Sequence, residues 1–210
     1  ACDFDNDGFT DLYVTYWRPN LLLRNTSKGS FEEVAAKARV AGTGKEWSSG
    51  CTFLDYNRDG LLDLFVTSYQ QFDLAKAPLP GKASNCEWKG MPVFCGPRGL
   101  PYGKATLYRN KGDGTFEDVT VASKVAEAQG FFAFTAIAAD MNSDGWTDVY
   151  VASDSTPSLL FRNNRNGTFS EIGTEAGVAF NEHGFEQGGM GVAYAVNALG
   201  SFPIILAGTE

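Results

Sequence analysis

The stretch DFDNDGFTD, residues 3–11, sets the frame for the whole chain of 210 residues. It carries oxygen-bearing side chains at loop positions 1, 3, 5 and 9, and glycine at position 6. The frame returns as DYNRDGLLD at residues 55–63 and as DMNSDGWTD at residues 140–148. Three copies in matching surroundings indicate one structural unit that is repeated along the chain.

Each copy has the ligand chemistry of a calcium loop. Ca²⁺ takes six to eight oxygen ligands at about 2.3–2.6 Å, and alternate residues of a tight loop point toward one centre. Glycine at position 6 permits the sharp bend. We expect up to three structural Ca²⁺ ions. The first loop, with four carboxylates, should bind most tightly if a preceding strand is supplied, whereas the second and third loops, which have strands on both sides, are the safer metal sites. The predicted ligands, with position 7 acting through its backbone carbonyl, are Asp3, Asp5, Asp7, Phe9 and Asp11; Asp55, Asn57, Asp59, Leu61 and Asp63; and Asp140, Asn142, Asp144, Trp146 and Asp148.

Position 12 separates these loops from EF-hands, which place a bidentate glutamate there. Here position 12 is Val14, Val66 or Val151, each inside a strand-like run. One alternative stays open: the three stretches could be Asp/Asn-Gly turns that hydrogen-bond to themselves without a metal.

Apolar runs with β-branched and aromatic residues follow each loop in a fixed order, which predicts strands joined by tight turns. A run also precedes the second and third loops, and a fourth unit begins near residue 188. The predicted strands cover residues 11–15, 20–25 and 29–34; 47–54, 63–67, 105–110 and 114–119; 131–139, 148–152, 158–163 and 167–172; and 188–193 and 204–207.

The spacing of the loops locates an insert. Asp3 lies 52 residues before Asp55, but Asp55 lies 85 residues before Asp140. The excess falls at about residues 69–102, which we expect to form a surface excursion. The units are then residues 1–46, 47–130, 131–187 and a partial unit at 188–210, in which no carboxylate remains in the loop frame.

A unit of about 50 residues with four short strands is typical of a β-propeller blade. We therefore predict an all-β fold: a β-propeller of four-stranded blades with about three to four blades present. Because a propeller closes with roughly four to eight blades, we also expect this chain to be part of a larger one.

The net charge of −8 argues against a nucleic acid partner, which needs a basic surface. Ten aspartates in the three loops account for much of this charge. Cys86 and Cys95 close a short Gly/Pro-rich segment, and we predict a disulfide there and hence an oxidising compartment. Cys2 and Cys51 lie in apolar runs and are predicted to be buried thiols, although their pairing is left open. No stretch is long and apolar enough for insertion into a membrane.

The loops followed by DLYVT or DLFVT, and the run LYRN…GDGTFEDVT, resemble FG-GAP or VCBS repeats of integrin alpha-type propellers. The insert NCEWKGMPVFCGPRGLPYGKATLYRNKGDGTF resembles bacterial proteins related to cartilage acidic protein, which typically carry a separate ASPIC/UnbV domain. The resemblance implies calcium at the Asp and Asn positions named above. It also implies an extracellular, cell-surface or periplasmic location.

The leading functional hypothesis is a calcium-stabilised binding or adhesion module without enzymatic activity, whose protein or glycan ligand is unknown. A propeller domain of a secreted carbohydrate-active lyase or hydrolase is the alternative, and a purely architectural spacer is another. His183, the single histidine, and the Glu182/Glu186 pair are best explained as loop residues rather than as a catalytic set.

Overall fold

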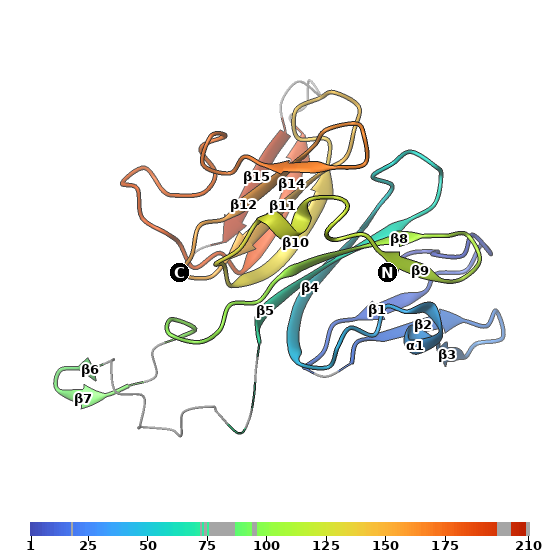
Figure 1. The fold of residues 1–210 in the computed structure, drawn as a ribbon, viewed down its shortest axis with the longest axis horizontal. Helices are drawn as coiled ribbons and strands as arrows, with labels where there is room; N and C mark the ends of the chain where they lie inside the picture. The colour runs from blue at the N-terminus through green and yellow to red at the C-terminus, as the bar shows by residue number, and fades with distance from the viewer. Residues whose placement is uncertain are drawn as a thin grey trace.

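The computed structural model describes residues 1–17, 19–71, 73, 75, 87–93, 96–196 and 203–208. The described chain forms antiparallel sheets with two short helical turns, α1 (Ala35–Ala38) and η1 (Val125–Glu127). It is an all-β partial propeller, which confirms the predicted fold class (Figure 1).

Two complete four-stranded sheets lie at the centre of the molecule, and a three-stranded and a two-stranded sheet flank them. Every predicted strand is present, and neighbours along the chain pair within each sheet. The bounds are β1 (Leu12–Val14), β2 (Leu21–Asn25) and β3 (Phe31–Glu33); β4 (Glu46–Leu54), β5 (Asp63–Gln71), β8 (Ala105–Asn110) and β9 (Phe116–Asp118); β10 (Ala133–Ala139), β11 (Asp148–Ser153), β12 (Leu159–Asn163) and β13 (Phe169–Glu171); and β14 (Gly191–Val196) with β15 (Pro203–Gly208).

The second strand of each complete sheet is buried on both faces because the sheets pack against one another. In β5, Leu64 and Val66 contact the core shared with the N-terminal sheet, whereas Phe65 contacts the core shared with the third sheet. In β11, Val149 faces the core that contains Phe65, and Tyr150 faces the side of the β14–β15 hairpin. Continuous apolar runs, rather than alternating ones, are therefore the sequence signal of these strands.

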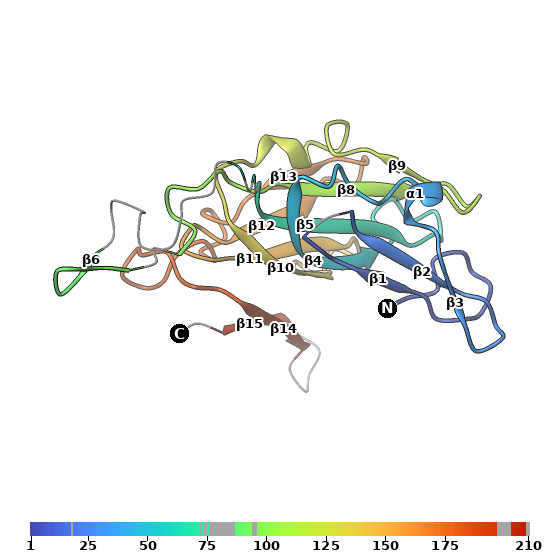
Figure 2. The ribbon, with the colours of Figure 1, turned by 90° about the horizontal axis from the view of Figure 1, so that it is seen from below.

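The insert leaves the second sheet after β5, which continues to Gln71. A two-stranded hairpin, β6 (Glu87–Trp88) and β7 (Met91–Pro92), stands clear of the sheets in Figure 1, and Figure 2 shows the same from a second direction. The chain returns through an isolated bridge between Gln70 and Tyr102. The described part of the insert is thus a surface excursion, tied to the sheet at its base.

The cysteines divide into two groups. Cys86 and Cys95 lie outside the described residues, so their disulfide stays a prediction. Cys2 and Cys51 are free, partly buried thiols, as the sequence predicted. Burial raises the pKa of Cys2 to about 12, so this thiol is protonated at neutral pH.

Candidate metal centres

The three loops occupy the same place in successive units. The second loop joins β4 to β5, and the third joins β10 to β11. The first precedes β1 and is closed by a bridge between Cys2 and Asp11, whose backbones hydrogen-bond to each other. The loops therefore lie at one end of the sheets, in a row across neighbouring units.

The backbone of each loop bends at two positions. Glycine at position 6 has φ of +88° in Gly8, +83° in Gly60 and +85° in Gly145, which confirms the reason predicted for glycine there. Position 4 is also left-handed, with φ of 56–61°, although no glycine marks it. The left-handed conformation of Asn6, Arg58 and Ser143 was not predicted from the sequence.

The carboxylates at positions 1 and 5 organise the turn from within. Asp3 accepts hydrogen bonds from the backbone N–H groups of Asp7 at 3.1 Å and Gly8 at 2.8 Å. Asp55 and Asp140 make the same two bonds in their own loops. These hydrogen bonds are compatible with a metal-free turn and with a calcium loop. A carboxylate oxygen that accepts one N–H still has a second lone pair with which it can bind a cation.

Three carboxylates converge in the first loop. Asp3, Asp5 and Asp11 each present an oxygen within 4.8 Å of the others. Oxygens that coordinate one Ca²⁺ at about 2.3–2.6 Å lie no farther apart than about twice that distance, so this separation fits a shared ion. Asp5 Oδ1 is buried and has no hydrogen-bond partner among the described residues. A cation, a water molecule or an N–H donor would each satisfy this oxygen.

Asp7, the remaining carboxylate of that loop, does not belong to the converging group. Its Oδ2 accepts a hydrogen bond from the Arg24 guanidinium at 3.0 Å, and Arg24 Nε also donates to Asp5 Oδ2 at 2.5 Å. Arg24 thus holds two acidic groups side by side. The proposed role of Asp7 as a ligand stays a prediction, as does that of the Phe9 carbonyl.

The second and third loops carry an amide at position 3 instead of a carboxylate. Asn57 Oδ1 accepts the N–H of Asp59 at 3.1 Å, while its Nδ2 donates to Asp59 Oδ2 at 2.8 Å. Asn142 and Asp144 repeat this arrangement. The amide therefore holds the position-5 carboxylate in place without adding negative charge, and the predicted ligands of these two loops stay predictions.

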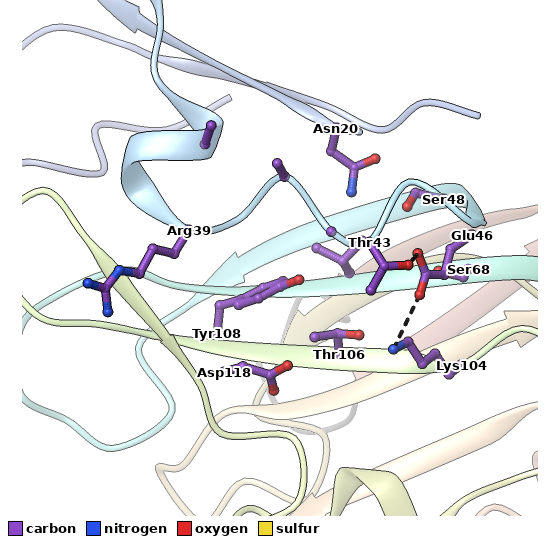
Figure 3. Close-up of a pocket in the computed structure, with 14 residues that line it drawn as sticks. Asn20, Arg39, Thr43, Glu46, Ser48, Ser68, Lys104, Thr106, Tyr108 and Asp118 are labelled. Carbon is purple, nitrogen blue, oxygen red and sulfur yellow. Dashed lines mark hydrogen bonds and ion pairs between the residues drawn. The ribbon is translucent and has the colours of Figure 1, made fainter. Parts of the chain in front are cut away.

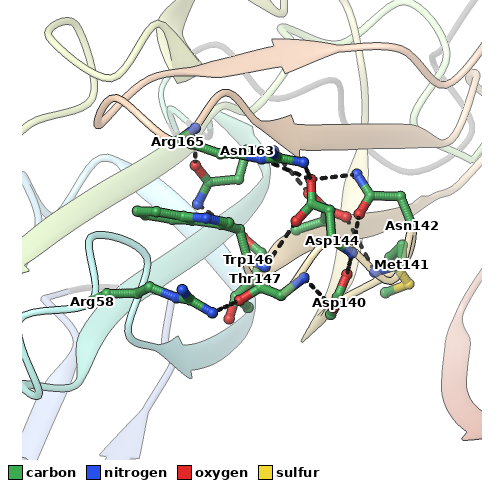
Figure 4. A network of polar contacts seen from close by, with 11 residues as sticks. Arg58, Asp140, Met141, Asn142, Asp144, Trp146, Thr147, Asn163 and Arg165 are labelled. Carbon is green, nitrogen blue, oxygen red and sulfur yellow. Dashed lines mark hydrogen bonds and ion pairs between the residues drawn. The ribbon is translucent and has the colours of Figure 1, made fainter.

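Arginines bind the third loop from both sides (Figure 4). Arg165 donates to Asp144 Oδ2 at 2.8 Å, and this hydrogen bond lowers the pKa of Asp144. Arg58, from the second loop, donates to the Gly145 carbonyl and lies over the Trp146 ring, 4.8 Å from its centroid. The second and third loops are thereby linked directly.

The position-9 carboxylates are the most buried acidic groups of the site. Asp11 and Asp63 are 0% exposed and Asp148 is 1% exposed. Each accepts one N–H from loop position 2 and one from the asparagine that ends β2, β8 or β12 in the same unit; for Asp63 these lie at 3.3 Å and 2.8 Å. Burial raises the pKa of all three, that of Asp63 to about 7, although the two N–H groups oppose the shift. These residues lock the loop to the sheet, and a bound cation would favour their charged form.

The asparagines that end β8 and β12, each preceded by an arginine, make contacts for which no role was predicted from the sequence. Asn110 Nδ2 donates to the Leu62 carbonyl of its own unit at 3.0 Å and to the Phe4 carbonyl of the preceding loop at 2.8 Å. Asn163 does the same with Thr147 at 3.2 Å and with Tyr56 at 2.9 Å. Each asparagine therefore connects two neighbouring loops, and its recurrence one residue after arginine was the available signal.

The remaining predicted loop residues behave as ordinary surface groups. His183 lies in a turn, where its N–H donates to Asn181 Oδ1 at 2.9 Å. Glu182 is exposed, and Glu186 pairs with Arg98 at 3.1 Å. None of the helices in the described ranges is long and apolar enough to cross a membrane.

Comparison with known proteins identifies the repeat. A comparison with curated proteins finds no match. The family model described as FG-GAP-like repeat matches three times, over residues 3–66, 93–151 and 140–195. The first match contains the first and second acidic loops, and the second and third matches each contain the complete third loop. The narrower resemblance to proteins related to cartilage acidic protein stays a prediction. Because the matches cover well over half of the sequence, the chain belongs to the FG-GAP-like repeat family.

Proposed function

We propose that this chain is a calcium-stabilised β-propeller module that acts in binding or adhesion outside the cytoplasm. The observation that carries the proposal is the convergence of Asp3, Asp5 and Asp11, one of which, Asp5, has a buried oxygen without a hydrogen-bond partner among the described residues. An all-oxygen ligand set of carboxylates, amides and carbonyls suits a hard cation such as Ca²⁺. Zinc, which prefers Cys and His ligands, is disfavoured by this set.

The role proposed for calcium is structural. Like charges at positions 1, 3, 5 and 9 repel one another, and an ion among them converts this repulsion into attraction. Since the loops contact each other through Asn110, Asn163 and Arg58, a rigid loop also orders the boundary between units. With a net charge of −8, three Ca²⁺ ions would leave the chain near −2.

A polar cavity between the N-terminal sheet and the second sheet favours binding over catalysis (Figure 3). Its volume is about 350 Å³, and its walls include Glu46, Lys104 and Asp118. Burial alone would raise the pKa of Glu46, but hydrogen bonds from Thr43 and Lys104 lower it overall. A general acid needs a raised pKa. Glu46 is therefore a poor candidate for a catalytic acid, and we propose a binding module rather than an enzyme.

The test is calcium binding by the chelator-treated protein. We expect calorimetry to show uptake of up to three Ca²⁺ ions, and 5 mM CaCl₂ to raise the thermal midpoint above that in EGTA. At ten times the dissociation constant each ion adds about 1.4 kcal/mol of stability. Asp5→Asn removes the orphaned carboxylate and should lose one site. Asp113→Asn, in an exposed turn outside the loops, is the matched control.

Magnesium at the same concentration should give a smaller shift, because it tolerates fewer protein oxygens and a stricter geometry. An absence of calcium uptake together with an unchanged thermal midpoint would sink the proposal. If Asp5→Asn and Asp113→Asn each lost one calcium site, the loss in Asp5→Asn would not show that Asp5 is a ligand, and the first loop would not be the site.

A further inference from the structure

A second cavity lies at the end of the sheets opposite to the acidic loops. β4 begins at Glu46 and reaches its loop only after Leu54, and β5 ends at Gln71, far from its own loop. The cavity has a volume of about 470 Å³ and is bounded by the distal ends of these strands, by β10 and by Pro97 and Leu100 of the insert. Its size is within the range of small-ligand sites, roughly 300–1,000 Å³.

Aromatic side chains form one wall of this cavity. Trp47 is 42% exposed and meets Tyr69 edge-on, with ring centroids 5.5 Å apart. Tyr69 contacts Phe134 in the same way at 5.6 Å, and its hydroxyl donates to Asp154 Oδ2 at 2.5 Å. Because Tyr69 is fixed at both ends, it holds the Trp47 ring in a defined place while the indole stays accessible.

The polar side chains among the described lining residues carry no charge. Gln70 is 3% exposed, and its Oε1 has no hydrogen-bond partner in the described part of the chain. Oε1 itself is buried, so a ligand reaches it only after the side-chain amide rotates toward the cavity, which the soft terminal torsion of glutamine permits. Ser48 and Ser49 also border the cavity, and Ser49 Oγ donates to the Ala133 carbonyl at 2.7 Å.

These features define the ligand chemistry. A ligand must offer a flat apolar face to an indole, must donate a hydrogen bond to a buried amide oxygen, and must be neutral, since no charged residue lines the described wall. A pyranose ring has such a face, formed by its axial C–H groups, and carries hydroxyl donors around its edge. The polar cavity near Glu46 differs, because Glu46, Thr43 and Lys104 already satisfy one another.

We propose that this cavity, the Trp47 pocket, binds a neutral pyranose unit of a glycan. The inference rests on the proposed function as a binding module and names its ligand class. Trp47 provides the stacking surface, Gln70 accepts a hydroxyl hydrogen bond, and Tyr69 is a positioning residue.

The experiment is calorimetric titration of the calcium-loaded chain with cellotetraose, laminaritetraose and mannotetraose. We expect saturable binding of at least one of them. Trp47→Ala should weaken it at least about tenfold, and Gln70→Leu about tenfold, as the loss of one hydrogen bond to a buried group implies. Trp47→Phe should retain most of the affinity, because an aromatic face remains.

Two matched controls use exposed residues outside the pocket: Phe31→Ala in β3 and Gln71→Leu, next to Gln70. Both should bind like the parent chain. Thermal midpoint and calcium uptake report whether each variant is folded, and they also separate the two proposals. Normal calcium uptake without sugar binding overturns only the pocket, whereas sugar binding without calcium uptake overturns only the metal role.

Equal affinity of the parent chain and Trp47→Ala would also overturn the inference. So would saturable binding of N-acetyl-tryptophanamide when none of the three sugars binds, because the pocket would then select an aromatic group.

Discussion

Asn163 makes four hydrogen bonds to protein groups through three of its polar groups, the backbone N–H, Nδ2 and Oδ1. Its N–H donates to Asp148 Oδ1 at 2.8 Å, its Nδ2 to the carbonyls of Tyr56 and Thr147, and its Oδ1 accepts the N–H of Arg165 at 2.8 Å. The side chain is 2% exposed. A single residue thus fixes its own loop, the next turn and the loop of the preceding unit.

At this scale we expect Asn163→Ala to lower the free energy of unfolding by about 2–4 kcal/mol, because two buried carbonyls lose their donor at about 1–3 kcal/mol each. Urea denaturation measures the loss. Asn164→Ala removes two side-chain hydrogen bonds, with Thr168 Oγ1 at 3.0 Å and with Ser170 Oγ at 3.1 Å, but it leaves no buried backbone carbonyl without its donor and should cost less than about 1 kcal/mol. Similar losses in the two variants would show that Asn163 does not join the units.

The residue scale is also where prediction from the sequence was least complete. Glycine at position 6 was predictable because the reason for it is local: the backbone of the loop has a positive φ at that position. The contacts of Asn110 and Asn163 were not, since their partners Phe4 and Tyr56 lie 106 and 107 residues away. Likewise, the pairing of Arg24 with Asp5 and Asp7 depends on how β2 lies beside the first loop.

Among the elements, β4 packs closely against β10 at Gly50. A Cβ at Gly50 would lie 2.8 Å from Thr135 Cα and 2.9 Å from the Phe134 carbonyl oxygen, both backbone atoms that cannot rotate away. The first strands of two successive sheets therefore need glycine at this point. Strand identity and order were predictable from apolar runs and turn residues, but this close approach was not, because β10 begins 83 residues after Gly50 in the sequence.

We expect Gly50→Ala to separate β4 from β10 and to cost about 1–3 kcal/mol, the usual range for overpacking. Gly191→Ala in β14 is the control, since a Cβ there meets nothing within 4 Å; its effect should stay within about 0.5 kcal/mol. Thermal unfolding of both variants measures the difference. A Gly50→Ala chain as stable as the parent would mean that the two sheets can shift apart without loss.

For the whole molecule, the three loops differ in how many neighbouring units they contact. The second loop contacts the third through Tyr56 and Arg58, and the first is joined to the second unit through Asn110 and Phe4. In a repeat protein, stability is approximately the sum of the units and of the boundaries between neighbours. The middle loop supports two of the described boundaries, whereas the first loop supports one.

Aspartate at position 1 is the residue with which to compare the loops, because Asp3 and Asp55 make the same two backbone contacts. Either alanine substitution should cost about 1–3 kcal/mol for the lost acceptors. In saturating calcium, Asp55→Ala should cost about 1 kcal/mol more than Asp3→Ala, since a disordered middle loop weakens a second boundary. Urea denaturation in calcium and in EGTA measures both. If Asp3→Ala is equally or more destabilising, the loops act independently, and the contacts of Tyr56 and Arg58 do not transmit order between units.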